Sequence, residues 1–122
     1  MTSCLASTLV VVGDDASFRY LIQRYADKSA CHAVFVSPKD DITNAVLHEA
    51  PKIVVLELDF PDEWGWKVLR ALKLHPETNK IPIIACSWSD ESERSLDEGA
   101  TVYLRKPILY DDFHAALIDV SN

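Results

Sequence analysis

The sequence predicts an α/β fold in which a parallel sheet is covered by helices on both faces. Short apolar runs rich in β-branched residues alternate along the chain with segments whose apolar side chains recur at helical spacing. The runs at 8–12 and 53–56 are apolar apart from Thr8, which is typical of strands buried on both faces. Parallel strands need crossover connections, and the intervening helical segments can supply them.

The first half of the chain contains three of the predicted strands. In order, we expect a strand at 8–12, a helix at about 16–28, a strand at 32–36, a helix from about 42 to 50 and a strand from 53 to 56. Phe18, Ile22 and Tyr25 fall on one face of the first helix. Pro51 ends the second helix, because proline cannot continue the hydrogen-bond ladder.

The second half continues the same alternation. We expect a helix from about 66 to 74, a strand at 82–86, a helix at 91–98, a strand at 101–104 and a last helix that carries Phe113, Ala116, Leu117 and Val120 on one face. Gly99 is well placed to end the fourth helix. Five strand–helix units in 122 residues indicate one domain over 1–122, a three-layer (βα)5 sandwich. Right-handed crossovers leave few topologies, and we predict the flavodoxin-like strand order 2-1-3-4-5.

Composition and charge exclude several classes of protein. The formal charge of −7 argues against binding to nucleic acid, which depends on basic patches. No apolar run approaches the roughly 20 residues that span a bilayer, and the start lacks the features of a secretory signal, so we expect a cytoplasmic protein without membrane contact. Cys4, Cys31 and Cys86 lack metal-binding spacing, and we assign the last two to the core.

Polar side chains follow the predicted strands where each one ends. Asp14 and Asp15 come after the first strand, Glu57 after the third, Ser87 after the fourth and Lys106 after the fifth. The carboxyl ends of parallel strands meet at one edge of the sheet, where ligands bind in such folds. Carboxylates, a hydroxyl and an ammonium group at one edge suit a divalent cation and a phosphoryl group.

With these strand ends in place, the chain resembles a response-regulator receiver domain of two-component signalling over essentially its whole length. The resemblance rests on an ordered set of motifs: Val11-Val12-Gly13-Asp14-Asp15 leading to Phe18-Arg19, Pro51 through Pro61 and Gly65, Leu69-Arg70-Ala71-Leu72-Lys73, Ile81-Pro82-Ile83-Ile84 to Ser87, and Gly99-Ala100 through Tyr103-Leu104 to Lys106-Pro107. No single motif decides the matter, but the set with these spacings is specific.

The resemblance implies roles for four residues near the ends of the fourth and fifth strands. Lys106 is similar to the lysine that grips the phosphoryl group, and Ser87 to the residue that hydrogen-bonds it on activation. Tyr103 is similar to the aromatic switch residue, and the Lys106–Pro107 peptide is expected to be cis. Each has a purely structural alternative: Lys106 in a salt bridge, Ser87 as a helix cap, and Tyr103 as half-buried packing.

The metal site implied by the resemblance is incomplete. Asp14 matches an acidic residue that binds Mg²⁺, and Asp59 the position whose backbone carbonyl also coordinates it, with Glu57 as a further candidate ligand. Gly13, however, stands where the family has the first acid of a pair. We name no certain cofactor and expect weak Mg²⁺ binding, because affinity depends on ligand number and charge.

The phosphoacceptor position carries Glu57 where the family has aspartate. The additional methylene group pushes the carboxylate into the space of the incoming phosphoryl group, so we expect weak or absent phosphotransfer. The carboxylate partly imitates a phosphate instead, with two oxygens within reach of Lys106 and Ser87. Two alternatives stay open: an ordinary receiver that is phosphorylated on Asp59 or Asp15, and, more remotely, a flavodoxin-like redox enzyme.

Three tryptophans, Trp64, Trp66 and Trp88, fall near the active edge and suggest a surface for a protein partner. Trp66 packing beneath its helix is an equally good interpretation, and Trp88 either blocks access by a histidine kinase or lies outward. We expect a stand-alone, non-enzymatic signalling module whose partner is a histidine kinase or a downstream signalling protein. The face formed by the fourth helix, the fifth strand and the fifth helix is a candidate homodimer surface.

Overall fold

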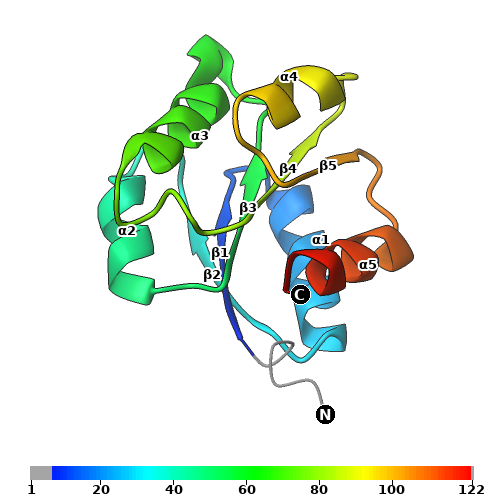
Figure 1. Ribbon diagram of the computed structural model, residues 1–122. Helices are drawn as coiled ribbons and strands as arrows, with labels where there is room; N and C mark the ends of the chain where they lie inside the picture. Colours follow the sequence, from blue (N-terminus) through cyan, green and yellow to red (C-terminus); the bar gives the residue numbers. More distant parts are fainter. Residues whose placement is uncertain (1–6, 122) are drawn as a thin grey trace.

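The protein folds as five parallel strands flanked by five helices, as seen in a computed structural model that describes residues 7–121 (Figure 1). The strands are β1 (Thr8–Val12), β2 (His32–Val36), β3 (Ile53–Glu57), β4 (Ile83–Ser87) and β5 (Val102–Arg105). The helices are α1 (Ala16–Lys28), α2 (Ile42–Glu49), α3 (Trp64–Leu74), α4 (Ser92–Asp97) and α5 (Tyr110–Ser121), with a 3-10 turn η2 at Pro61–Glu63. The strand order is β2-β1-β3-β4-β5, which confirms the predicted topology.

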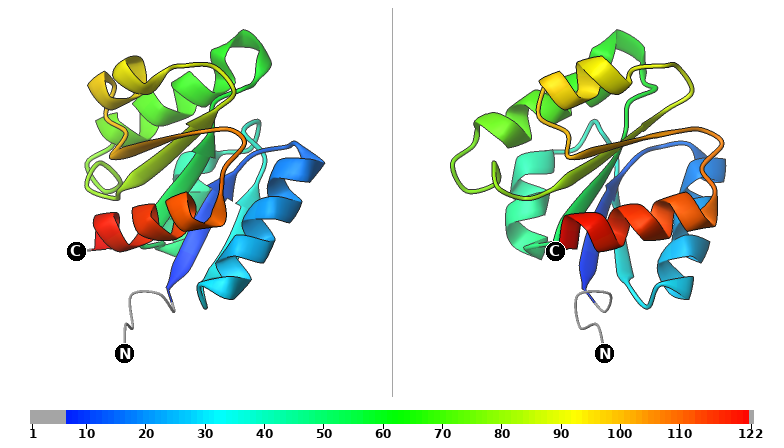
Figure 2. Two further views of the ribbon diagram at one scale, coloured as in Figure 1. Left: turned by 90° about the vertical axis from the view of Figure 1, so that its right-hand side faces the viewer. Right: turned by 45° about the vertical axis from the view of Figure 1, so that its right-hand side comes forward.

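The sheet lies between two helical layers: α2 and α3 lie on one side of it and α1 and α5 on the other in Figure 1, and Figure 2 turns the side of α1 and α5 toward the viewer. Side chains alternate along each strand, so successive residues of β1 face opposite layers. Val10 and Val12 join a core with residues of α2 and α3, whereas Leu9 and Val11 join a core with residues of α1 and α5. This is why residues 9–12 of β1 and 53–56 of β3 are all apolar: both faces of the central strands are buried.

The start of α3 is the clearest difference from the predicted boundaries. The helix begins at Trp64, two residues earlier than expected, because η2 leads directly into it. Gly65 makes this entry possible, since a β-carbon there would lie 2.7 Å from the Cα atom of Leu58. The first turn of α3 therefore packs directly on the chain that leaves β3, and it holds that segment close to the sheet edge.

The other boundaries move by a residue or two. Both β4 and β5 end one residue later than expected, because Ser87 pairs with Arg105 in the parallel ladder. The fourth helix is shorter than the predicted 91–98, and Gly99 beyond it has a φ of 112°. This conformation strongly favours glycine.

Two of the cysteines lie in the core as predicted. Cys31 and Cys86 are both buried, and burial raises the pKa of the Cys86 thiol to about 12. Cys4 lies outside the described residues. Within residues 7–121, the helices are all too short or too polar to cross a bilayer.

Candidate functional site

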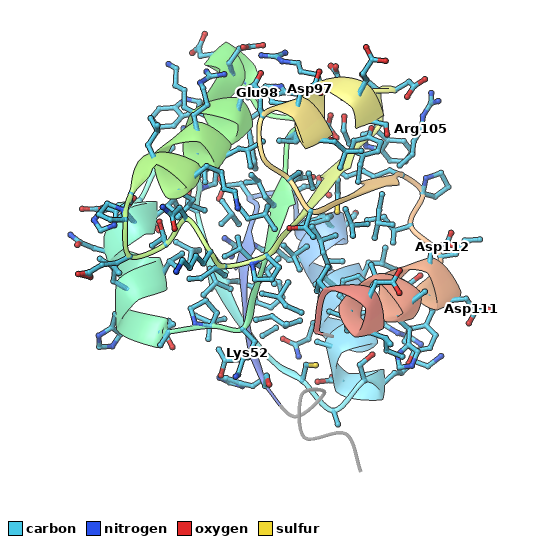
Figure 3. All side chains as sticks on the ribbon, viewed as in Figure 1. Lys52, Asp97, Glu98, Arg105, Asp111 and Asp112 are labelled. Atoms are coloured by element: carbon cyan, nitrogen blue, oxygen red, sulfur yellow. The ribbon has the colours of Figure 1, made fainter. Side chains whose placement is uncertain are left out.

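The carboxyl edge of the sheet brings together residues from three neighbouring strands. β3 ends at Glu57 and β4 ends at Ser87, and the pairing of Glu57 with Cys86 and of Ser87 with Arg105 sets the three strand ends side by side. Arg105, labelled in Figure 3, marks the end of β5 next to α4. Lys106 follows it directly, with its backbone N–H donating to the carbonyl of Ser87 at 2.8 Å.

Glu57 and Lys106 form a buried ion pair at the centre of this edge. Lys106 Nζ contacts Glu57 Oε2, and the two side chains are only 7% and 2% exposed. Burial raises the pKa of Glu57, although Lys106 opposes this, and the charges of Asp15 and Asp59 raise it further. The expected contact between the Glu57 carboxylate and Lys106 is therefore present.

The second oxygen of Glu57 has no hydrogen-bond partner. Oε1 is buried and points toward Gly13, where a β-carbon would lie 3.0 Å from it and 3.0 Å from the Phe18 ring. The prediction that Glu57 also reaches Ser87 is wrong, because the Ser87 hydroxyl donates to a different carboxylate. The Glu57 carboxylate is thus bound through Oε2 alone.

That carboxylate belongs to Asp59, for which the sequence indicated only a backbone role. Ser87 Oγ donates to Asp59 Oδ1 at 2.7 Å, and the backbone N–H of Trp88 donates to Oδ2 at 3.0 Å. Lys106 Nζ lies 3.1 Å from the same Oδ2. Asp59 comes two positions after Glu57. In an extended chain, alternate side chains point to the same face, so continuing the strand beyond Glu57 would have predicted that both carboxylates lie on one face of the sheet.

Lys106 is therefore shared between two carboxylates. Burial alone would lower the pKa of its ammonium group, but the hydrogen bonds and charges of Glu57 and Asp59 outweigh burial and raise it. Two nearby carboxylates on one ammonium leave an excess of negative charge, and the unpartnered Glu57 Oε1 is part of that excess. The Lys106 ammonium group is therefore already in contact with two carboxylates of the chain itself.

Asp14 is turned away from this cluster. Its carboxylate accepts a hydrogen bond from Ser37 Oγ at 3.1 Å and lies 3.6 Å from Arg19. Asp15 caps α1 by accepting from the backbone N–H of Phe18 at 2.8 Å. The two acids that follow β1 are therefore engaged in local contacts.

The acidic residues do not fit the Mg²⁺ site that the resemblance implied. The Glu57 and Asp59 carboxylates already contact Lys106, and that of Asp14 contacts Arg19. Across the described part of the chain, no three His, Cys, Asp or Glu side chains are grouped so that they could hold a metal ion.

The two switch candidates lie beside the loop between β4 and α4: Ser87 is the last residue of β4, and Tyr103 lies within β5. The Tyr103 hydroxyl donates to the Ser89 carbonyl and accepts from the backbone N–H of Glu91 at 3.2 Å, while the ring packs against the core. Ser87 does not cap α4: the N-cap residue is Glu91, and no side chain makes a capping hydrogen bond there. The Lys106–Pro107 peptide is cis, as the resemblance implied.

The three tryptophans do not form one surface. Trp66 is only 4% exposed and belongs to the core, with the Arg94 guanidinium 3.8 Å from its ring centroid, so its assignment to a partner surface is wrong. Trp64 is partly buried. Trp88 is 60% exposed and lines a shallow apolar pocket with Phe18 and Ile108, next to Lys106. The outward interpretation of Trp88 agrees with this exposure.

Comparison with known proteins identifies relatives of the whole domain. The sequence profile described as "Response regulator receiver domain" matches residues 9–118. A transcriptional regulatory protein of Pseudomonas aeruginosa, GltR, is 31% identical over 103 residues, which cover 82% of this chain and 43% of that protein. The transcriptional regulatory protein YxdJ of Bacillus subtilis is 26% identical over 84% of this chain and 45% of its own length. The chain spans less than half the length of these curated relatives.

Solved structures agree in fold. A putative response regulator from Chloroflexus aurantiacus superposes with a TM-score of 0.85 at 17% identity, covering 93% of this chain and 96% of that one. The signal receiver domain of a DNA-binding response regulator from Colwellia psychrerythraea gives a TM-score of 0.82 at 18% identity, covering 93% and 97%.

Proposed function

Because the chain belongs to the response regulator receiver domain family, we propose that it is a two-component signalling module that works without phosphorylation of Glu57. One observation carries the proposal: the Glu57 carboxylate is 2% exposed and ion-paired with Lys106. A nucleophile in phosphoryl transfer must line up with the phosphorus atom of its donor, and small misplacements are costly. A carboxylate enclosed in this way is poorly placed to attack.

The same contacts give the site a permanent anionic occupant. Lys106 already contacts the carboxylates of Glu57 and Asp59, and Ser87 already donates to Asp59. The resemblance assigns both donors to the phosphoryl group. Their occupation by the chain's own carboxylates supports an active-like bias that needs no modification.

The module would act by binding a protein partner, either a histidine kinase or a downstream signalling protein. The exposed Trp88 beside the site and the α4-β5-α5 face are the candidate surfaces, and the second is also the candidate for homodimerisation. Trp88 would supply a large apolar contact area.

Intact mass spectrometry tests the proposal directly. The protein is incubated with a small phosphodonor and Mg²⁺, and the mass is expected to stay unchanged. A stoichiometric gain of one phosphate on Glu57 would overturn it. The Glu57→Asp variant, treated in parallel, shows whether the rest of the site supports phosphate uptake once the side chain has the family's length.

A second candidate is a receiver phosphorylated on another carboxylate. Asp59 is favoured over Asp15 because it contacts both Lys106 and Ser87 and remains 27% exposed, whereas Asp15 is engaged in capping α1. The same incubation would then add phosphate to the parent protein and to Glu57→Gln, but not to Asp59→Asn.

A further inference from the structure

We propose that Asp59 is an internal ligand that fills an oxyanion site and excludes external oxyanions such as inorganic phosphate from it. The site consists of three donors: the hydroxyl of Ser87, the backbone N–H of Trp88 and the ammonium group of Lys106. They lie 2.7, 3.0 and 3.1 Å from the two Asp59 oxygens. Hydrogen bonds of this kind, in which one or both partners are charged, are the strong ones.

The fold fixes the positions of these three donors. Ser87 is the last residue of β4 and is buried, and Lys106 follows β5 and is 7% exposed. The backbone at Trp88 is also fixed, because the Trp88 carbonyl accepts a hydrogen bond from the Arg105 side chain at 3.1 Å. Ser87 and Lys106 are buried, and a buried donor left without an acceptor destabilises a fold, so their side chains would take up water or another anion if Asp59 were absent.

Asp59 sits where it would compete with an incoming ion. Its side chain is 27% exposed, whereas Lys106, which also contacts Glu57, is only 7% exposed. Glu57 already carries an unpartnered buried oxygen, so an additional anion beside both carboxylates would be repelled. An external oxyanion would therefore have to replace Asp59 and could not bind alongside it.

The backbone holds Asp59 at this position. The N–H of Leu58 donates to the Cys86 carbonyl at 2.9 Å, which continues the pairing of β3 with β4 beyond Glu57. The N–H of Phe60 donates to the Leu58 carbonyl at 2.9 Å, which closes a tight turn around Asp59. Gly65 lets α3 pack on Leu58 at close range, so the turn is supported from outside.

Melting temperature in the presence of inorganic phosphate tests the proposal. Phosphate is titrated against sodium chloride of equal ionic strength, using the whole chain of the parent and of Asp59→Ala. We expect no phosphate-specific shift for the parent, and for Asp59→Ala a rise in Tm of roughly 3–8 °C at tenfold excess over the phosphate Kd. Asp90→Ala is the matched control, because it removes an exposed carboxylate from the loop after β4 without touching the donors.

Two further variants make the result decisive. Adding Ser87→Ala to Asp59→Ala removes one donor, so the phosphate-specific rise should shrink or vanish. Asp59→Asn keeps the side-chain size but loses the charge and one acceptor, and it should show a smaller rise; it also serves if Asp59→Ala does not fold. Equal shifts in the parent and in Asp59→Ala, or no phosphate-specific shift in a folded Asp59 variant, would overturn the proposal.

The inference rests on the proposed function only in giving the site a signalling role. Different experimental outcomes would contradict the proposed function and the role of Asp59. Covalent phosphate on Glu57 in the mass experiment would contradict the proposed function while leaving the phosphate titration unaffected. Covalent phosphate on Asp59 would contradict the internal-ligand role, because a phosphorylated Asp59 is an acceptor and not an occupant. No covalent gain together with no Tm shift in Asp59→Ala would overturn only the role of Asp59.

Discussion

Gly13 faces Glu57 so closely that a β-carbon at position 13 would lie 3.0 Å from Glu57 Oε1. The two residues come from the ends of adjacent strands, since Val12 of β1 pairs with Leu56 of β3. They are also the two positions at which the chain departs from the acidic pattern that its resemblance to receivers implied. The longer acid at 57 extends into the space that the missing side chain at 13 leaves open.

Gly13→Asp should therefore be costly while Glu57 is present. The new side chain would crowd the Phe18 ring and place a second carboxylate against a buried oxygen, at a cost of about 2–3 kcal/mol in the free energy of unfolding. In the Glu57→Asp background the same substitution should cost about 1–2 kcal/mol less, because the shorter side chain withdraws. Urea unfolding of all four proteins in the cycle measures this coupling, and strictly additive costs would show that the positions are independent.

Removing the ammonium group of Lys106 should destabilise the domain much more than removing a surface cation. Lys106→Met leaves the Glu57 carboxylate buried without its counter-charge, which typically costs about 3–5 kcal/mol. Arg70→Met breaks the half-exposed pair with Glu98 and should cost at most about 1 kcal/mol. Denaturant unfolding of both variants gives the comparison. Similar losses in the free energy of unfolding for the two variants would mean that the buried pair stabilises the fold no more than the surface pair.

Glu57 should make the domain less stable as the pH rises from about 4.5. Burial raises the pKa of Glu57 above its ordinary value of 4.5, so the folded protein keeps this proton at a pH where the unfolded chain has released it. Between those two pKa values the folded state binds more protons, and this contribution to stability is lost as pH increases. Urea unfolding between pH 4.5 and about 7.5 should show the decline in the parent relative to Glu57→Gln.

Glu63→Gln is the matched control for this pH series. The hydrogen bond from Arg94 holds the pKa of Glu63 below its ordinary value, so its contribution is present above that value and lost as the pH falls. The difference between the parent and Glu63→Gln should therefore change little between pH 4.5 and about 7.5 and shrink as the pH falls below about 4.5, which is opposite in sense to the Glu57 contribution. A Glu57→Gln difference that follows the same direction as Glu63→Gln would contradict the assignment.

Tyr103→Phe should loosen the segment between β4 and α4 with little effect on the rest of the fold. Its hydroxyl contacts the Ser89 carbonyl and the Glu91 N–H, while the ring packs on the core independently of these bonds. We expect a loss of about 0.5–1.5 kcal/mol and faster amide hydrogen exchange over residues 88–97. Tyr20→Phe, on the exposed face of α1, should leave that exchange unchanged. Faster exchange spread over the whole sheet would point to a global role for Tyr103 instead.

Local pattern was sufficient for the elements of this fold because each apolar run carries its own periodicity. The run of apolar residues at 9–12 predicted a strand covered on both faces, and the parallel topology followed from the alternation with helices. The helix start at Trp64 was missed because it depends on the close approach of Gly65 to Leu58, a contact between segments that no periodicity reports.

The sequence by itself determined that Glu57, Ser87 and Lys106 end neighbouring strands, because the carboxyl ends of parallel strands share one edge. Only the tertiary structure decided which carboxylate meets which donor. Asp59 accepts from Ser87 and shares Lys106 with Glu57, whose other oxygen extends toward Gly13. Those choices depend on the strand register, the tight turn around Asp59 and one methylene of side-chain length, all of which are settled by packing between distant segments and not by spacing along the chain.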